Sequence, residues 1–371
     1  MSKLKNLIIF YPSIEIGGAT AIFYNLVEIF SKKKVNLIII TSKSNNNYSF
    51  KKKIKIISSN NFFIPFINNR IISSFICSIS LFKTLLRLKS HNTKVLSMQS
   101  NFFSVIISFL LNFKIAVRVS EDPCGASIHS SNLLFGWIIF FTKIITYNLS
   151  TLIITNATRS KFCIKNIILS SKKIKVLFNP YLKKIYNFKL IKTSKKIIFS
   201  AGRFTKQKNF SCLIEAYKII SQIKKYKDYK LIICGSGTEE LILKKKIIDY
   251  NLRNKIFIYS WNNNLKNFYL KSQLYVLPSL YEGMPNTLID AINYEIPIIS
   301  SDVSGVADLI VNPKSYQIIN KINKYNLASS IIKALEDYSS LKRNSKILKK
   351  NLFRYTVNRA GLNFWNTMSK F

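Results

Sequence analysis

Short apolar runs and longer amphipathic segments alternate along the whole chain. In the first half, β-branched runs occur at residues 5–11, 35–41, 54–58, 93–98, 114–119, 151–155 and 174–178. Between them apolar residues recur at helical spacing, as in the series Ile22, Leu26, Ile29 and Phe30. Buried strands that alternate with helices predict right-handed βαβ units, in which helices cover both faces of a parallel sheet.

The alternation restarts beyond residues 180–195. A second series of apolar runs occupies residues 196–204, 229–237, 254–260, 272–278 and 296–302. Two successive series in a chain of 371 residues predict an α/β protein with two facing, doubly wound Rossmann-like domains. We place the first domain at residues 1–185 and the second at residues 186–350, with a closing helix at residues 351–371.

Acidic residues are scarce and unevenly distributed. Only 16 residues are Asp or Glu, yet five fall between positions 282 and 308, namely Glu282, Asp290, Glu295, Asp302 and Asp308. In parallel α/β sheets, ligands bind beyond the carboxyl ends of the strands, where loops lead into helices. Carboxylates also favour helix starts in general, but this clustering points to a ligand site.

The first 180 residues contain four acidic residues, and three of them follow predicted strands. These are Glu15, which precedes Gly17 and Gly18, and the adjacent pair Glu121 and Asp122; the fourth is Glu28. A glycine pair between a strand and a helix lets the backbone approach an anion, although any tight turn would use it too. Glu121 and Asp122 either orient or deprotonate an acceptor, or they cap the next helix.

Two cations lie in a loop that leads into a helix of the second series. Arg203 and Lys208 belong to the stretch "SAGRFTKQKNFSCLIEA". Arginine binds phosphate by forked hydrogen bonds and lysine binds it as a point charge, so the pair suits a diphosphate. The chain has 57 basic residues, so this pair gains weight only in combination with Glu282.

In combination, these motifs resemble glycosyltransferase family 4, the retaining nucleotide-sugar enzymes of GT-B architecture. The resemblance is strong in "GRFTKQKN", "CGSGTEE" and "LPSLYEGMPNTLIDAINYEIPIISSDVSGVADLI". It continues more loosely through "GGAT", "RVSEDP" and "VLFNP" in the first half. It implies a cleft between the two domains and a closing helix that packs back on the N-terminal domain.

The resemblance also implies roles for individual residues. Arg203 and Lys208 would bind the donor diphosphate, Glu282 would contact the transferred sugar, and Asp290 would hold the ribose hydroxyls. The family usually has Glu at position 290, and it usually has Gly near Ser260 and Trp261. Glu121 would act on the acceptor side, and His129 would touch the donor sugar if it is not simply a loop residue. The remaining donor-binding residues would be Gly17, Gly18, Gly235, Gly283, Met284, Pro285 and Asn286.

The activity implied is transfer of a sugar, from UDP in most similar proteins, to a glycan or lipid-linked acceptor of cell-surface polysaccharide or lipopolysaccharide. No Asp-x-Asp occurs in the sequence, which fits metal-independent chemistry, and no cofactor is implied. Two alternatives stay open. One is another GT-B enzyme, such as a nucleotide-sugar epimerase, and the other is a non-catalytic protein that binds polyanions.

The net charge of +41 gives the polyanion alternative little support. The charge is +20 over residues 1–180 and +21 over residues 181–371, so no basic tail is present. Lys, Ile, Asn, Phe and Tyr are abundant throughout, as in proteins from AT-rich genomes. We expect no nucleic-acid partner, whereas an anionic membrane or a phosphate ligand remains compatible with the charge.

Targeting and cysteine patterns indicate a cytoplasmic protein. The five cysteines are odd in number and contain no C-x-x-C pair, so we expect neither a disulfide framework nor a zinc site. The first apolar run is too short for a signal peptide. No apolar run reaches ~18 residues, and residues 102–113 and 133–141 are expected to be buried core helices.

One segment indicates reversible attachment to the inner face of the cytoplasmic membrane. Residues 61–89 combine an apolar stripe with Arg70, Lys83, Arg87 and Lys89, a pattern typical of interfacial helices. The alternative is a core helix with solvated lysines.

Overall fold

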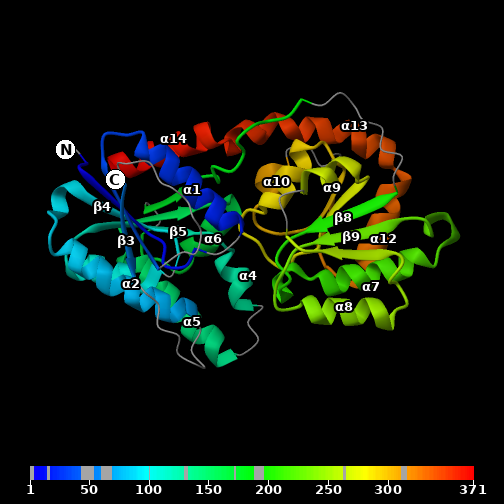
Figure 1. The fold of residues 1–371 in the computed structure, drawn as a ribbon, viewed down its shortest axis with the longest axis horizontal. Helices are drawn as coiled ribbons and strands as arrows, with labels where there is room; N and C mark the ends of the chain where they lie inside the picture. Colours follow the sequence, from blue (N-terminus) through cyan, green and yellow to red (C-terminus); the bar gives the residue numbers. More distant parts are fainter. Residues whose placement is uncertain are drawn as a thin grey trace. The chain divides into compact units, whose positions relative to one another are not determined.

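The computed structural model describes residues 4–14, 17–42, 54–59, 69–99, 101–128, 133–170, 173–187, 196–261, 265–310 and 316–371. It divides into two compact units (Figure 1). Unit 1 comprises Met1–Lys183 and Tyr355–Phe371, and unit 2 comprises Lys184–Arg354. The chain therefore passes from one unit to the other twice.

Unit 1 contains a seven-stranded parallel sheet with the order β3-β2-β1-β4-β5-β6-β7. Its strands coincide with the seven apolar runs of the first half, and their register pairs Leu7 with both Leu37 and Lys94. The bounds are β1 (Asn6–Phe10), β2 (Asn36–Ser42), β3 (Ile54–Ser59), β4 (Thr93–Ser97), β5 (Lys114–Val119), β6 (Leu152–Thr155) and β7 (Ile174–Val176).

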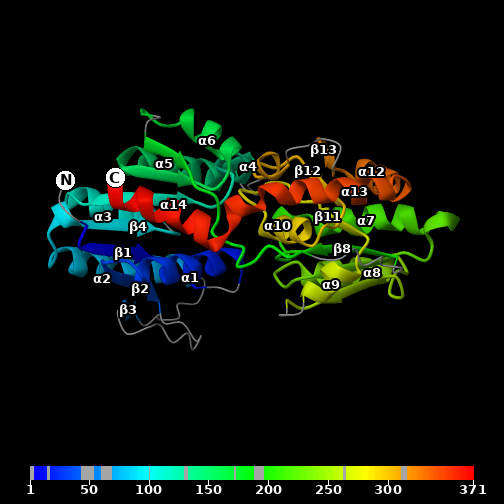
Figure 2. The ribbon, with the colours of Figure 1, turned by 90° about the horizontal axis from the view of Figure 1, so that it is seen from above.

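Helices cover both faces of this sheet. On one face α1 and α14 form a core with the sheet, and on the other face α2, α3, α5 and α6 do so. The bounds are α1 (Gly18–Ser31), α2 (Asn69–Leu85), α3 (Asn101–Leu110), α4 (Pro123–Ile128), α5 (Leu133–Leu149), α6 (Thr158–Lys165) and α14 (Val357–Lys370). Figure 2 shows α14 beside α1 from above, although both lie far apart in the sequence.

The C-terminal helix α14 is bound to unit 1 by its apolar face and by the residue pair that precedes it, Tyr355 and Thr356. Phe364 and Met368 are buried in the same core as Phe30. The carbonyl of Tyr355 accepts hydrogen bonds from the amides of Tyr181 and Leu182, at 3.0 and 2.9 Å. The two segments that connect the units are therefore paired with each other inside unit 1.

Unit 2 contains a six-stranded parallel sheet with the order β10-β9-β8-β11-β12-β13. Its strands are β8 (Ile197–Ala201), β9 (Lys230–Cys234), β10 (Ile256–Tyr259), β11 (Leu274–Leu277), β12 (Ile298–Ser301) and β13 (Tyr316–Ile319). The first five were predicted, whereas β13 was not. This edge strand has the sequence YQII, which is too short and too mixed in polarity to stand out as an apolar run.

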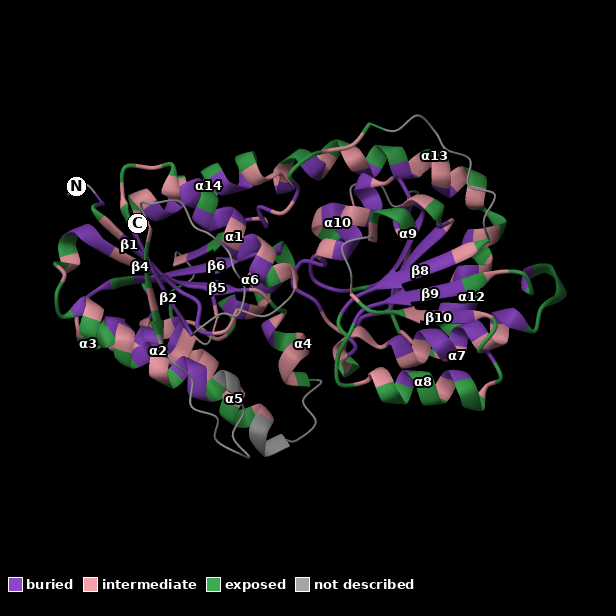
Figure 3. Cartoon of the chain, in the orientation of Figure 1, coloured by how far each residue is buried: buried purple, intermediate pink, exposed green. Residues whose placement is uncertain are grey.

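Helices also cover both faces of the second sheet. One face packs against α7 (Phe210–Ser221), α8 (Glu240–Asp249) and α12 (Lys324–Glu336). The other face packs against α9 (Leu265–Lys271) and α10 (Asn286–Asn293), where Phe199 contacts Tyr269 and Tyr269 contacts Tyr275. The short α11 (Val306–Leu309) follows β12, and α13 (Tyr338–Leu348) contacts β13 and α10. Figure 3 shows the strands of both sheets buried and the outer helix faces exposed.

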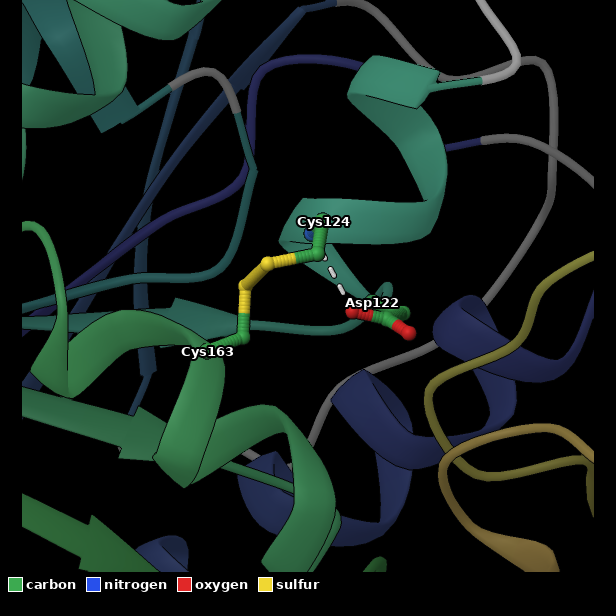
Figure 4. A group of neighbouring side chains, drawn as sticks. All are labelled: Asp122, Cys124 and Cys163. Carbon is green, nitrogen blue, oxygen red and sulfur yellow. Dashed lines mark hydrogen bonds between the residues drawn. A yellow bond between two sulfur atoms is a disulfide. The ribbon is translucent and has the colours of Figure 1, made fainter.

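Two sequence-based expectations are wrong. Cys124 and Cys163 form a disulfide (Figure 4), because the fold brings the start of α4 next to α6 across a sequence separation of 39 residues. No spacing rule could show this. The helices of the segments 102–113 and 133–141 are only partly buried: Val105 of α3 lies in the core, but Leu110 is 73% exposed and Trp137 of α5 is 57% exposed.

Within the described residues, no helix has both the length and the apolar character that crossing a bilayer requires.

Candidate functional site

The strand order of unit 2 reverses between β8 and β11. In doubly wound sheets, such a switch point leaves the loops after the two central strands free to diverge, and ligands bind between them. Here those loops contain residues 202–209 and 278–285. Hydrogen bonds join the loops, because Gln207 Nε2 donates to the carbonyl of Tyr281 at 2.9 Å and Leu280 N donates to the carbonyl of Gln207 at 2.8 Å.

An ion pair between Lys208 and Glu282 forms the centre of this switch point. The Lys208 ammonium donates to Glu282 Oε1, and the hydroxyl of Ser279 donates to the same oxygen at 2.8 Å. The side chains of Lys208 and Glu282 are only 13% and 9% exposed. Burial strengthens electrostatic interactions, so the ion pair adds to the hydrogen bonds that join the two loops.

The carboxylate is held in place from the neighbouring strand. The hydroxyl of Ser301, the last residue of β12, donates to the carbonyl of Ser279. Ser279 in turn donates to Glu282. This chain of hydrogen bonds restricts the position of Glu282 before any ligand binds.

Helix α10 begins at Asn286, after the short turn that follows Glu282. Pro285 is its N-cap, and the first amides of a helix have no acceptor inside the helix. The turn that precedes it is packed closely by Gly305, because a Cβ atom there would lie 2.2 Å from the carbonyl oxygen of Gly283. The start of α10 therefore presents donors to an anion, in a position fixed by the loop after β12.

Asp290 lies one turn further along α10 and is half-buried. Its position four residues after Asn286 puts both on one side of the helix. Burial raises the pKa of the Tyr275 hydroxyl, and the negative charges of Glu282 and Asp290 add to this rise. Both carboxylates therefore lie close enough to this buried tyrosine of β11 to influence its pKa.

Arg203 and Gly235 lie at the same edge of the sheet. Arg203 is exposed in the loop after β8. Gly235 follows β9, and a Cβ atom at this position would lie 1.9 Å from the carbonyl oxygen of Gly202. Close packing of the two loops therefore requires glycine at position 235. Its role in donor binding stays a prediction.

Glu295 belongs to a separate, structural cluster. Its carboxylate pairs with Lys349 at 2.7 Å, and its carbonyl accepts hydrogen bonds from Lys342 and Ser345 at 2.7 and 2.9 Å. These contacts bind the turn after α10 to α13 and the residue that follows it. Asp302 is exposed and Asp308 is half-buried on α11. Glu295 therefore has a structural role, and of the five acidic residues only Glu282 and Asp290 lie on the strand–turn–helix element at the switch point.

In unit 1 the predicted residues follow β1 and β5. Gly17 is the N-cap of α1 with a φ angle of 157°, a conformation that favours glycine. Glu121 is exposed, whereas Asp122 Oδ1 accepts a hydrogen bond from the amide of Cys124 at 3.1 Å. Asp122 therefore caps α4, one of the two alternatives for this pair. Glu15 and His129 lie outside the described residues.

The sequence-based interpretation missed a buried arginine in unit 1. Arg118 donates to Asn179 Oδ1 at 2.8 Å and to the hydroxyl of Ser120. Its burial lowers the pKa of the guanidinium to about 10. This hydrogen bond joins the motifs "RVSEDP" and "VLFNP". The sequence feature that could have indicated a special role is the presence of an arginine inside an apolar strand. In unit 2, Ser279 and Gln207 lay in quoted motifs but their roles depend on contacts that sequence does not show.

Comparison with known proteins identifies what this chain resembles. Residues 183–351 match the family described as Glycosyl transferases group 1. The chain is 24% identical to the N-acetylgalactosamine-N,N'-diacetylbacillosaminyl-diphospho-undecaprenol 4-alpha-N-acetylgalactosaminyltransferase of Campylobacter jejuni, over 90% of this chain and 91% of the relative. It is 26% identical to the UDP-Gal:alpha-D-GlcNAc-diphosphoundecaprenol alpha-1,3-galactosyltransferase of Escherichia coli, over 60% of this chain and 63% of the relative.

Coverage of the relatives is partial in several cases. An uncharacterised glycosyltransferase of Methanocaldococcus jannaschii is 32% identical over 46% of this chain and 44% of the relative. This alignment and the one with the Escherichia coli enzyme span less than two thirds of the relatives' own length. Among solved structures, that of Anabaena HepE in complex with UDP and glucose has a TM-score of 0.77 at 14% identity, over 99% of this chain and 100% of that one. At this identity the likeness shows the fold alone.

Proposed function

We propose that this chain is a retaining glycosyltransferase of the glycosyl transferases group 1 family, whose model matches residues 183–351. The chain has the GT-B fold. It would transfer a sugar from a nucleotide-sugar donor to a glycan or lipid-linked acceptor during assembly of cell-surface polysaccharide or lipopolysaccharide. The relatives with diphospho-undecaprenol in their names support a lipid-linked acceptor. The structural neighbour with bound UDP supports a UDP-sugar as donor.

The buried Lys208–Glu282 pair at the switch point carries this proposal. Cleavage of a sugar–phosphate bond builds negative charge on the leaving diphosphate and positive charge on the sugar. Lys208 and Arg203 would stabilise the diphosphate, and the amides at the start of α10 would contribute further donors. Glu282 would exchange its lysine partner for sugar hydroxyls when the donor binds.

In this arrangement the two partners of the ion pair neutralise each other until the donor arrives. A diphosphate attracts Lys208, and its departure from the pair leaves a buried carboxylate that needs new hydrogen-bond donors. Hydroxyls of the transferred sugar would supply them. Sugar and diphosphate would thus be recognised together, because each satisfies one partner of the pair.

A panel of ligands tests the activity and identifies the donor. We expect UDP and one UDP-sugar to raise the melting temperature of the full chain, since ligands that bind only the folded state stabilise it. The same donor should be consumed with acceptor present and remain intact without it, apart from slow hydrolysis. Turnover of donor alone to an isomeric nucleotide sugar would instead establish the epimerase, and salt-sensitive DNA binding without any nucleotide response would establish the polyanion alternative.

The lipid-linked acceptor requires access to a membrane surface, and unit 1 has a suitable outer layer. Neighbouring helices α2, α3 and α5 expose large apolar side chains, here called the outer apolar patch. Those more than 40% exposed are Ile71, Phe75, Ile79, Phe82, Leu86, Phe109, Leu110, Trp137, Ile138, Phe141 and Ile145. Those in and just after α2 recur every three or four residues and therefore form one stripe.

Basic residues border the patch. Lys83, Arg87 and Lys89 are exposed at the end of α2 and just after it, while the side chain of Arg70 lies outside the described residues. Each basic residue near an anionic bilayer contributes about 1 kcal/mol. An apolar stripe flanked by cations is typical of helices that lie in the bilayer interface. We therefore propose that unit 1 attaches reversibly to anionic membranes through the outer apolar patch.

Liposome flotation tests the attachment. We expect the full chain to float with anionic vesicles at low salt and far less with neutral ones, because both apolar burial and charge contribute. Ile79→Glu, in the centre of the stripe, should reduce flotation by an order of magnitude or more. Leu362→Glu is the matched control, since Leu362 is 44% exposed on α14, which covers the opposite face of the sheet. Absence of flotation with either vesicle, or equal loss in both variants, would contradict the proposal.

A further inference from the structure

Three potential metal ligands of unit 1 lie together outside the switch point of unit 2. Asp122, Cys124 and Cys163 each offer one ligand atom, and these atoms lie within 4.8 Å of one another (Figure 4). Asp122 directly precedes α4, Cys124 lies in the first turn of α4, and Cys163 belongs to α6. In the oxidised form the two sulfurs are joined as a disulfide with a Cα–Cα distance of 6.1 Å.

We propose that Cys124, Cys163 and Asp122 form a Zn²⁺ site when the disulfide is reduced. Two electrons and two protons from a dithiol reductant convert the disulfide into two thiols. Each thiol then loses its proton as Zn²⁺ binds, so the metal replaces two protons and holds two thiolates and one carboxylate. A water molecule would complete a tetrahedral shell, as in zinc sites with three protein ligands.

Two thiolates and one carboxylate favour Zn²⁺ as the metal at this site. Thiolates favour Zn²⁺ over Mg²⁺ and Ca²⁺, which prefer sites made of oxygen atoms alone. Zn–S bonds of ~2.3 Å separate two sulfurs by roughly 3.8 Å in a tetrahedral site. The Cα–Cα distance of 6.1 Å between Cys124 and Cys163 is compatible with this sulfur–sulfur separation.

The surroundings favour both access and charge balance. Cys124 is exposed, whereas Asp122 and Cys163 are half-buried, so an ion can enter from solvent. The carboxylate of Asp122 is already oriented by the amide of Cys124 at 3.1 Å. Two thiolates, one carboxylate and Zn²⁺ leave a net charge of −1, and Lys143 lies nearby, with its ammonium 3.1 Å from the carbonyl of Pro123.

The ammonium of Lys143 interacts electrostatically with the carboxylates next to this site. Burial lowers the pKa of Lys143, and the carboxylates of Glu121 and Asp122 partly offset that effect. The cation thus lies close enough to the turn to interact with its charges. Either cross-link, disulfide or metal, ties α4 to α6 and so restrains the turn that also contains Glu121. In the reduced, metal-free protein this turn would have neither cross-link to restrain it.

Metal titration of the full chain tests the site independently of enzymatic activity. The protein is reduced with a phosphine under anaerobic conditions and titrated with Co²⁺, then with Zn²⁺ against a chromophoric chelator. We expect one Co²⁺ per chain with a thiolate-to-cobalt charge-transfer band, displaced by one Zn²⁺. Cys163→Ser and Cys124→Ser should each abolish the band, and Asp122→Asn should weaken Zn²⁺ binding, because the neutral amide replaces a charged ligand.

Two controls test whether metal binding is specific to Cys124 and Cys163, and whether the disulfide is present in the oxidised protein. Cys212→Ser, in unit 2, should bind metal like the unchanged protein. After denaturation the oxidised protein should present three titratable thiols and the reduced protein five. The proposal is overturned if the reduced, folded protein takes up no stoichiometric metal, if Cys163→Ser retains the charge-transfer band, or if the oxidised protein binds equally well.

Discussion

Replacement of Lys208 by alanine should slow sugar transfer by roughly 10²–10³-fold, the loss typical when one preorganised group that stabilises transition-state charge is removed. The same substitution leaves the carboxylate of Glu282 buried without its cation. Removal of one partner of a buried ion pair lowers the free energy of unfolding by about 3–5 kcal/mol. We therefore expect a lower melting temperature as well as a lower rate. Initial rates per folded molecule and thermal unfolding measure the two effects separately.

Two further variants separate catalysis from stability. The double variant Lys208→Ala/Glu282→Gln has no unpaired buried carboxylate at position 282. Most of the lost stability should therefore return, while sugar transfer stays slow. Lys246→Ala is the matched control, because Lys246 pairs with Glu215 between α8 and α7, where the side chains are 21% and 29% exposed. It should affect stability slightly and transfer not at all. Transfer at the normal rate by folded Lys208→Ala would show that the pair is only structural.

The strand pattern was predictable because parallel strands buried on both faces read as continuous β-branched runs. Within the residues that the structure describes, twelve of the thirteen strands coincide with such runs. The exception, β13, is an edge strand with only two adjacent isoleucines, Ile318 and Ile319. The outer helices were misjudged for a related reason. Hydropathy shows that Leu110 and Trp137 are apolar, but their exposure depends on which side of a helix faces the sheet.

The site was predictable in its residues but not in its contacts. Lys208 and Glu282 are separated by 74 positions, and only the strand order shows that their loops flank the same switch point. Glu295 was counted with the ligand-binding carboxylates because composition cannot distinguish it from Glu282. Its pairing with Lys349 requires the packing of α13 against α10. The disulfide was missed for the same reason, since cysteine spacing does not reveal which helices are neighbours.

Glu282 and Asp290 should bind different parts of the donor, the transferred sugar and the ribose respectively. Asp290→Ala should weaken binding of free UDP by roughly 10- to 150-fold, because a hydrogen bond to a charged group contributes ~1.5–3 kcal/mol and ~1.4 kcal/mol is a factor of ten. Aspartate is a poor residue for a helix interior, so its place one turn into α10 favours a role in binding the ribose hydroxyls. Calorimetry with nucleotide alone gives the affinity directly.

Glu282→Ala should behave differently with the same ligand. The carboxylate faces Lys208 and Ser279 at the turn before α10, where the sugar rather than the ribose would lie. Its removal frees the Lys208 ammonium for the diphosphate, so UDP should bind with equal or higher affinity while transfer falls. Asp302→Asn, at an exposed carboxylate after β12, should change neither quantity. Equal nucleotide losses in Glu282→Ala and Asp290→Ala, or no loss in Asp290→Ala, would show that the two carboxylates do not contact opposite ends of one donor.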